Sequence, residues 1–293
     1  MTHKAGFVNI LGNPNVGKST LMNALVGEKL SIITSKAQTT RHRIMGIVNG
    51  EDFQIVYSDT PGILKPAYKL QESMMKFVSL AMRDADIILY LTDIYETPDK
   101  NMNYISKLQK TKIPVILLIN KIDQSNQDQL AALVEMWHGI LPDSEILPIS
   151  ALKKFNVEPL LKKVTSMLPE SEPFFPKDQL TDKSQRFFIE EMIREKILLH
   201  YSKEIPYSVE VETEDFIEEE KIIRIRTIIF VMRDSQKGII IGHKGEKLKK
   251  VGTEARKDAE DFFGKKVFLE IIVRVNKDWR DDKKQLKRYG YEV

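Results

Sequence analysis

The 293-residue chain has no cysteine and no long run of apolar residues. Without cysteine, a disulfide framework and a thiolate-ligated metal site are excluded, which fits a reducing compartment. No apolar run approaches the eighteen or so residues that a membrane span needs, and the first residues lack the apolar core of a signal peptide. We therefore expect a cytoplasmic protein that is not exported by that route.

Excess charge of one sign is also lacking, because 45 basic residues stand against 42 acidic ones. The second half of the chain is nevertheless polarised. Residues 210–220 carry seven acidic side chains and no basic one, whereas residues 237–250 carry five lysines and one glutamate. An anionic partner should therefore bind the second of these segments.

Short apolar runs alternate with amphipathic stretches over residues 1–170, which predicts an α/β domain with a mostly parallel sheet and helices on both faces. The predicted strands cover residues 7–11, 53–59, 86–93, 113–121 and 145–150. The predicted helices cover residues 18–27, 70–84, 99–110, 126–139 and 156–167.

A stretch with three prolines, "LPESEPFFPKDQL" (168–180), is typical of a linker, and we set the linker at 171–183. The α+β pattern that follows predicts a second domain over residues 184–293. Its predicted elements are a helix at 184–203, strands at 207–214 and 221–232, helices at 239–249 and 251–262, a strand at 266–275 and a polar tail.

The stretch "GNPNVGKS" (12–19) follows a predicted strand and precedes a predicted helix, as a phosphate-binding P-loop does. Glycines at 12 and 17 allow the backbone to approach phosphate oxygens. Lys18 supplies a charge to the β- and γ-phosphates, and Ser19 offers a hydroxyl to Mg²⁺. The segment therefore predicts a nucleoside triphosphate site.

Three further motifs at strand ends indicate which nucleotide binds. In "DTPG" (59–62), Asp59 can hold Mg²⁺ through water and the Gly62 amide can meet a γ-phosphate. In "NKID" (120–123), the Asp123 carboxylate can accept from both guanine donors, which adenine does not present in that arrangement. In "SAL" (150–152), the backbone amide of Ala151 can reach guanine O6.

The four motifs together predict a GTP/GDP site. The residues predicted to bind the nucleotide are Gly12, Asn13, Pro14, Asn15, Val16, Gly17, Lys18, Ser19, Thr20, Asn120, Lys121, Asp123, Ser150, Ala151 and Leu152.

These motifs resemble those of the translation-factor-related GTPases. With "AQTTRHRI" and "GIIIGHKGEKLKK" included, nearly the full length of the chain resembles the GTPases of bacterial ribosome assembly. The resemblance implies a G domain joined to a type II KH domain. It further implies a GTP-hydrolysing switch that binds the 3′ end of 16S rRNA and acts on 30S precursors in small-subunit biogenesis. We expect a monomer, and the resemblance alone suggests peripheral association with the inner face of the cell membrane.

Two positions bear on the rate of hydrolysis. Ile63 stands where Ras-like proteins place a water-orienting glutamine, so we expect slow intrinsic turnover. Thr40 resembles the switch threonine that binds Mg²⁺, with Thr39 the less favoured candidate. Asn15 resembles the asparagine that helps to hold K⁺ in potassium-activated relatives, although it could simply cap the loop. We expect catalysis to depend on Lys18, Thr40, Asp59 and Gly62.

A second binding motif, "GHKG" (242–245), lies in the basic segment. A G-x-x-G loop of this kind clamps the backbone of single-stranded RNA. The predicted RNA-binding residues are Ile241, Gly242, His243, Lys244, Gly245, Lys247, Lys249 and Lys250. In the basic tail, Trp279, Tyr289 and Tyr291 could stack on bases or could pin the tail to the domain.

Two rival functions remain open from the sequence. A constitutive RNA-binding module with a structural nucleotide would need neither "DTPG" nor the switch threonines, and GTP turnover separates it from a switch. An RNA-modifying enzyme would need a further catalytic domain or a reactive cysteine, and the chain shows neither.

Overall fold

The computed structural model describes residues 3–291, with the side chains at positions 99 and 100 excepted. Its internal contacts divide the chain into two compact units. The first runs from the N-terminus to Pro66 and from Met74 to Asp182. The second contains Ala67–Ser73 and the chain from Lys183 to the end of the described residues.

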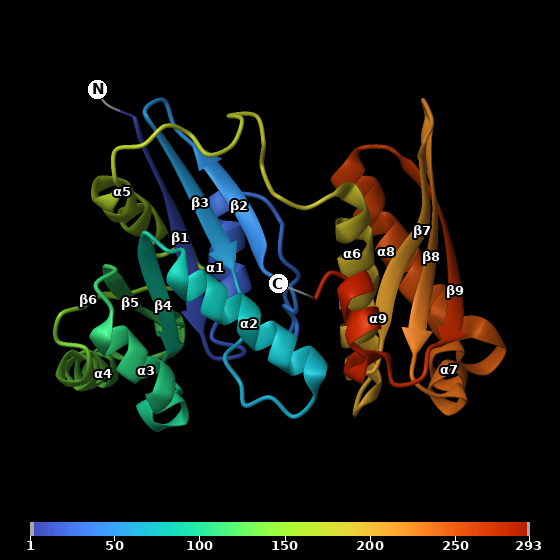
Figure 1. Cartoon of the computed structure of the whole chain (residues 1–293), viewed down its shortest axis with the longest axis horizontal. Helices are drawn as coiled ribbons and strands as arrows, with labels where there is room; N and C mark the ends of the chain where they lie inside the picture. Colours follow the sequence, from blue (N-terminus) through green and yellow to red (C-terminus); the bar gives the residue numbers. More distant parts are fainter. Residues whose placement is uncertain (1–2, 292–293) are drawn as a thin grey trace. The chain divides into compact units, whose positions relative to one another are not determined.

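The first unit is built on a six-stranded sheet in the order β2-β3-β1-β4-β5-β6 (Figure 1). Only β2 is antiparallel to its neighbour. The strands are β1 (Lys4–Gly12), β2 (Ile44–Asn49), β3 (Phe53–Asp59), β4 (Ile87–Asp93), β5 (Val115–Asn120) and β6 (Glu145–Pro148). The helices are α1 (Lys18–Val26), α2 (Lys69–Arg83), α3 (Met102–Lys110), α4 (Gln127–Ile140) and α5 (Val157–Met167).

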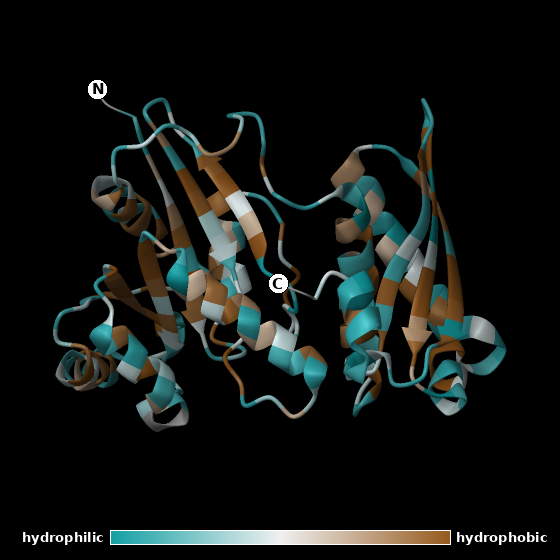
Figure 2. Ribbon diagram, in the orientation of Figure 1, coloured by the Kyte–Doolittle hydropathy of each residue, from teal (hydrophilic) through white to brown (hydrophobic). Residues whose placement is uncertain are grey.

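Helices cover both faces of this sheet, with α1 packed against α5 on one face and α2 and α3 across the other (Figure 1). Every residue of β4 is buried. Most of this strand is brown in Figure 2, the colour of hydrophobic residues. Parallel strands covered on both faces carry continuous apolar runs, which is why their positions could be predicted. The predicted α/β class is confirmed.

Strand β2 was not predicted from the sequence. It pairs with β3 from Ile44 opposite Asp59 to Asn49 opposite Gln54. Its sequence, "IMGIVN", is short, and a glycine interrupts it. A Cβ at that glycine, Gly46, would lie 2.5 Å from the end of Met22 and 2.7 Å from Val26, so β2 packs closely on α1 there. The strand is therefore specified by pairing and close helix contact, which apolar periodicity does not reveal.

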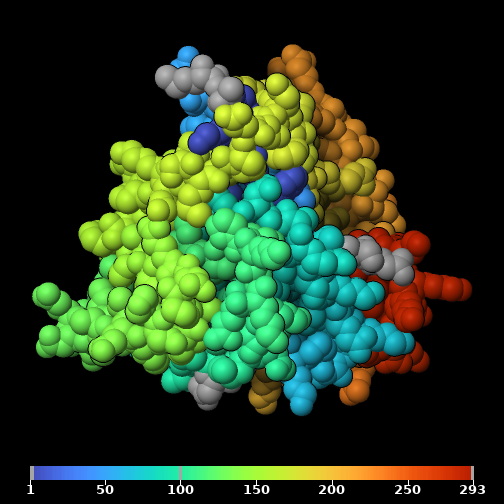
Figure 3. Space-filling model, turned by 60° about the vertical axis from the view of Figure 1, so that its left-hand side comes forward, coloured from blue at the N-terminus to red at the C-terminus, as the bar shows by residue number. Residues whose placement is uncertain are grey.

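The predicted linker is largely bonded to the first unit. The buried Gln54 side chain on β3 donates to the carbonyl of Phe175 (2.8 Å), and the amide of Ile47 on β2 donates to the carbonyl of Leu180 (2.8 Å). Figure 3 shows this segment, in yellow, against the surface of the unit. The first unit accordingly extends to Asp182, and most of the segment predicted as a linker at 171–183 belongs to it.

The second unit has a three-stranded sheet in the order β7-β8-β9, with β7 antiparallel and β9 parallel to β8. The strands are β7 (Glu210–Glu218), β8 (Ile222–Val231) and β9 (Lys266–Val275). The helices are α6 (Gln185–His200), α7 (Asp234–Ile241), α8 (Glu246–Phe263) and α9 (Lys283–Arg288). The order α-β-β-α-α-β through β9 is that of a type II KH domain.

The predicted helix boundaries around the G-x-x-G turn were wrong. Helices were expected at 239–249 and 251–262, but α7 ends at Ile241 and α8 begins at Glu246. Between them Gly242 and Gly245 adopt φ angles of +73° and +80°, which side chains disfavour. The turn therefore interrupts the first predicted helix, and the second is part of one longer helix.

The tail is folded, and its aromatic residues pin it to the domain. Trp279 is fully buried and donates through Nε1 to the carbonyl of Ser208 (3.1 Å). Tyr291 is also buried and donates to the Glu210 carboxylate (2.9 Å). Tyr289 packs edge-on against Trp279. The alternative that these rings stack on bases is thereby excluded for Trp279 and Tyr291.

Between residues 3 and 291, none of the helices has the length and apolar character needed to cross a bilayer.

Candidate nucleotide site and nucleic-acid interface

The P-loop connects β1 to α1, and its two glycines are required by close approach. At Gly12 (φ +149°) a Cβ would lie 2.1 Å from the carbonyl oxygen of Leu91, and at Gly17 (φ +103°) it would lie 2.3 Å from Nδ2 of Asn120. The Lys18 ammonium is buried and donates to the carbonyls of Gly12 (3.1 Å) and Asn13 (2.7 Å). The loop backbone is therefore held open around one buried cation.

Three oxygen-bearing side chains from separate motifs converge beside this loop. Ser19 Oγ donates to Oδ2 of Asp59 (2.7 Å), and Thr40 Oγ1 donates to the same oxygen (3.2 Å). The two hydroxyl oxygens lie 3.0 Å apart. The second carboxylate oxygen of Asp59 is buried without a hydrogen-bond partner among the described residues. Burial raises the pKa of Asp59, and the nearby Lys18 charge opposes that shift.

Hard oxygen donors with one unsatisfied carboxylate oxygen are the donor set that Mg²⁺ prefers. The residues predicted for magnesium, Ser19, Thr40 and Asp59, therefore fit that ion. The less favoured Thr39 instead bonds with Thr34 (2.7 Å) and donates to the carbonyl of Lys36 (2.6 Å), so it takes no part in this cluster.

The segment after Asp59 lies directly against the P-loop. A Cβ at Gly62 would lie 2.7 Å from Pro14, and the Ile63 amide donates to the carbonyl of Gly12 (3.1 Å). The Ile63 side chain is buried. It is therefore an apolar core residue, which agrees with the expectation that it cannot orient a water molecule.

Asn120 connects the predicted base-binding motifs to the P-loop and to each other through hydrogen bonds. Its Nδ2 donates to the carbonyl of Val16 (2.8 Å), and its Oδ1 accepts from the amide of Ala151 (3.0 Å). Ser150 Oγ donates to Oδ1 of Asp123 (2.6 Å), which orients that carboxylate. The predicted contact of the Ala151 amide with guanine O6 stays a prediction, since this amide here binds Asn120.

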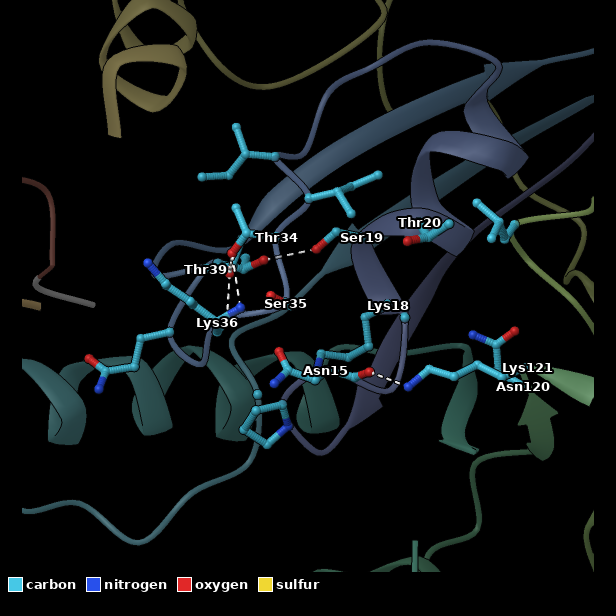
Figure 4. Close-up of a pocket in the computed structure, with 18 of the residues that line it drawn as sticks. Asn15, Lys18, Ser19, Thr20, Thr34, Ser35, Lys36, Thr39, Asn120 and Lys121 are labelled. Carbon is cyan, nitrogen blue, oxygen red and sulfur yellow. Dashed lines mark hydrogen bonds between the residues drawn. The ribbon is translucent and has the colours of Figure 1, made fainter. Parts of the chain in front are cut away.

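These motifs enclose a cavity of about 390 Å³ (Figure 4). The predicted residues that line it are Pro14, Asn15, Gly17, Lys18, Ser19, Thr20, Thr40, Gly62, Asn120, Lys121, Asp123 and Leu152. The predicted residues that lie behind this lining are Gly12, Asn13, Val16, Asp59, Ser150 and Ala151, all of them buried or backbone-bonded. The sequence motifs therefore supply both the wall and its support.

Part of the wall and three supporting contacts were not predicted from the sequence. Residues 32–36 and 38–39, in the segment before Thr40, line the cavity. Lys121 Nζ forms an ion pair with Asp93 (2.5 Å) and donates to the carbonyl of Asn15 (2.8 Å; Figure 4). Asn101 donates to the side chain of Asn13. The run of hydroxyl residues before Thr40 was the available signal for the wall, whereas the other contacts join distant segments.

The second candidate site is the turn between α7 and α8. His243 and Lys244 are exposed at its tip, and Lys247 follows in the first turn of α8. Lys249 and Lys250 are exposed on the same helix, whereas Ile241 and Gly242 are half-buried. Helix N-termini and basic side chains both favour phosphate groups. The turn can therefore bind an anionic backbone.

Fold and sites together define a P-loop GTPase joined to a KH domain. Residues 7–121 match the family model described as a 50S ribosome-binding GTPase, and residues 204–280 match that of the KH domain. The chain is 44% identical over 295 residues to GTPase Era of Alkaliphilus metalliredigens, with 100% of both chains covered. The chain belongs to the GTPase Era family.

Two further comparisons agree with this assignment. GTPase Era of Staphylococcus epidermidis is 42% identical over 291 residues, which cover 99% of this chain and 97% of that one. A solved structure of Era in complex with MgGDPNP and nucleotides 1506–1542 of 16S ribosomal RNA has a TM-score of 0.95 at 38% identity. That match covers 99% of this chain and 100% of the other. The chain is thus a GTPase with a KH domain.

The buried P-loop lysine makes nucleotide affinity depend on pH. Burial lowers the pKa of Lys18 to about 8, and the Asp59 charge opposes that shift. Phosphate groups favour the ammonium form, so GTP binding above pH 8 must take up a proton. We expect GTP affinity to fall by about tenfold per pH unit above 8.

Titration calorimetry in buffers of different ionisation enthalpy measures this proton uptake directly. Lys18→Arg is the control, because the guanidinium of arginine does not titrate in this range. Any titration of the guanine base of GTP affects both proteins equally. Affinity of the unmodified protein that stays constant from pH 7 to 9.5 would contradict the prediction.

Proposed function

We propose that the protein is a GTP-hydrolysing switch whose nucleotide state governs how its KH domain binds the 3′ end of 16S rRNA during small-subunit maturation. The single observation that carries the proposal is the convergence of Ser19, Thr40 and Asp59. The P-loop, the switch segment and the "DTPG" motif meet at one carboxylate there. A change of nucleotide or metal at this point therefore acts on the switch segment directly.

Magnesium fits this cluster, with Ser19, Thr40 and Asp59 as the residues that would hold it. When bound, the ion neutralises charge on the β- and γ-phosphates. Lys18 adds a fixed positive charge, and the P-loop amides orient the phosphates. No arginine finger is assigned, and Ile63 supplies no hydrogen bond to water, so intrinsic hydrolysis is slow.

Potassium stimulation is part of this proposal. Asn15 lines the cavity and adopts a φ of +67°, so a P-loop side chain is presented at the phosphate end. One electrostatic stabiliser at a transition state is worth on the order of a hundredfold in rate. We expect GTP turnover to be about tenfold faster, or more, in KCl than in NaCl at equal ionic strength.

The variant that tests this role of Asn15 is Asn15→Gly, because glycine accepts the positive φ without strain. It should remove the difference between the two salts and leave GDP affinity nearly unchanged. Turnover rates in the two salts that are indistinguishable for the unmodified protein would contradict potassium stimulation.

RNA binding is assigned to the turn at 242–245 and the lysines that follow it. Support comes from the exposed His243 and Lys244, from the KH match, and from the Era complex that contains 16S ribosomal RNA. We further propose that the protein is a cytoplasmic monomer that acts on 30S precursors. Peripheral association with the membrane is proposed from the family resemblance alone.

The test of the switch compares two nucleotide states. A 3′-terminal fragment of 16S rRNA is titrated against the protein bound to GDP and to a non-hydrolysable GTP analogue. A nucleotide shifts an equilibrium only through different affinities for its two states. We expect unequal dissociation constants, and equal ones would leave two independent activities on one chain.

A further inference from the structure

The ends of three helices meet beneath the G-x-x-G turn, and Tyr201 contacts two of them. Tyr201 ends α6, where its amide donates to the carbonyl of Ile197 (3.0 Å). Its side chain is 4% exposed, and its hydroxyl donates to the carbonyl of Ile240 at 2.6 Å. Carbonyls in the last turn of a helix have no partner within the helix. The tyrosine hydroxyl therefore ties the end of α7 to the end of α6.

The ring of the same tyrosine lies next to Lys247, in the first turn of α8. The Lys247 ammonium is 5.8 Å from the ring centroid, within the range of a cation–π interaction. The lysine stem also packs on the turn, because a Cβ at Gly242 would lie 2.8 Å from its Cβ and Cγ. An exposed lysine is thus bounded on one side by backbone and on the other by an aromatic ring.

Such confinement matters for binding to a phosphate. A free lysine side chain loses rotamer entropy when it is fixed. Prior ordering in the unbound protein lowers that cost. Burial raises the pKa of Tyr201 to about 12, so its hydroxyl remains a donor at neutral pH.

We propose that Tyr201 is a positioning residue for RNA binding, which holds the end of α7 through Ile240 and presents the Lys247 ammonium to an RNA phosphate. The inference rests on the proposed function, in which the turn at 242–245 binds RNA.

Four variants test it: Tyr201→Phe, Tyr201→Leu, Lys247→Gln and the double variant Tyr201→Leu/Lys247→Gln. Each is titrated with a 3′-terminal 16S rRNA fragment at several KCl concentrations, well below its unfolding temperature. The matched control is Tyr207→Phe. Tyr207 is half-buried in the same unit, and its hydroxyl has no hydrogen bond to the part of the chain that the structure describes.

The salt dependence separates positioning from a merely structural role. The slope of log affinity against log salt is negative, and loss of one phosphate contact to single-stranded RNA lowers its magnitude by about 0.7. We expect Lys247→Gln to show this decrease. Tyr201→Leu should also make the salt slope shallower. The double variant should bind RNA no more weakly than the single variant that has the lower RNA affinity.

Tyr201→Phe keeps the ring and loses only the hydroxyl. It therefore tests the role of Tyr201 even if Tyr201→Leu is unstable. We expect it to bind RNA about two- to tenfold more weakly with an unchanged salt slope. The Tyr207→Phe control should bind as the unmodified protein does. GTP turnover of the RNA-free protein should be unaffected in every variant.

The outcomes distinguish this inference from the proposed function. If Lys247→Gln weakens RNA binding but both Tyr201 variants bind normally, the positioning role is overturned and the RNA site stands. Additive losses in the double variant also overturn it. If Lys247→Gln changes neither affinity nor slope, the lysine lies outside the RNA site, and the inference fails together with that part of the proposed function.

Discussion

Replacing Asp123 by asparagine should move the base preference of this GTPase from guanine to xanthine. The Asp123 carboxylate lines the cavity, and Ser150 holds one of its oxygens at 2.6 Å. A carboxylate accepts from two guanine donors, whereas an amide offers one acceptor and one donor group. Xanthine carries a carbonyl in place of the exocyclic amine, so it suits the amide. Loss of two charge-assisted hydrogen bonds should weaken GDP binding roughly 10²- to 10⁴-fold.

Dissociation constants for GDP and xanthosine diphosphate measure this change. Ser150 can still donate to the amide oxygen of the variant, so the loop should keep its conformation. Asp128→Asn, at an exposed site in the first turn of α4, is a matched control and should leave both constants unchanged. If the Asp123 variant retains the guanine preference of the unmodified protein, base recognition does not depend on this carboxylate.

Aspartates at positions 243 and 244 should nearly abolish RNA binding while leaving the nucleotide site intact. Both side chains are exposed at the tip of the turn, where like charge would face phosphates. Lys244 adopts a φ of +48°, a conformation that aspartate tolerates better than most residues. The variant should therefore fold and bind the rRNA fragment at least tenfold more weakly. The magnitude of its salt slope should be smaller by about 0.7 for each lost phosphate contact.

The control for this variant changes charge elsewhere on the same unit. Lys283 and Lys284 are exposed at the start of α9, and their replacement by aspartates alters the net charge more than the turn variant does. If the control weakens RNA binding as much, the effect comes from overall charge and not from the turn. GDP affinity should be the same in both variants.

Much of the nucleotide site could be predicted because its requirements are local. Gly12 and Gly17 adopt positive φ angles that favour glycine, so their spacing is visible in the sequence. Asp59 and Asn120 end buried parallel strands, and the strand ends bring them together at one edge of the sheet. Apolar runs place those strands, and the motif positions follow from them.

The features that escaped prediction depend on partners that are distant in the sequence. Gln54 bonds with the Phe175 carbonyl across 121 residues, and a buried glutamine has no periodic signal. The apolar pattern of "GIIIG" continues a helix through Gly242, although the backbone turns there. Trp279 could be read as a stacking platform or as a core residue, and only its contact with Ser208 distinguishes these roles.

The attachment of the proline-rich segment to β2 and β3 leaves little free chain ahead of α6. Leu180 is bonded to β2, and Asp182 accepts from the amide of Met45 on the same strand (2.8 Å). Ser184 already caps α6, so Lys183 alone separates these two fixed points. The free chain ahead of α6 is therefore one residue long, where the prolines of the sequence predict a linker of 13 residues.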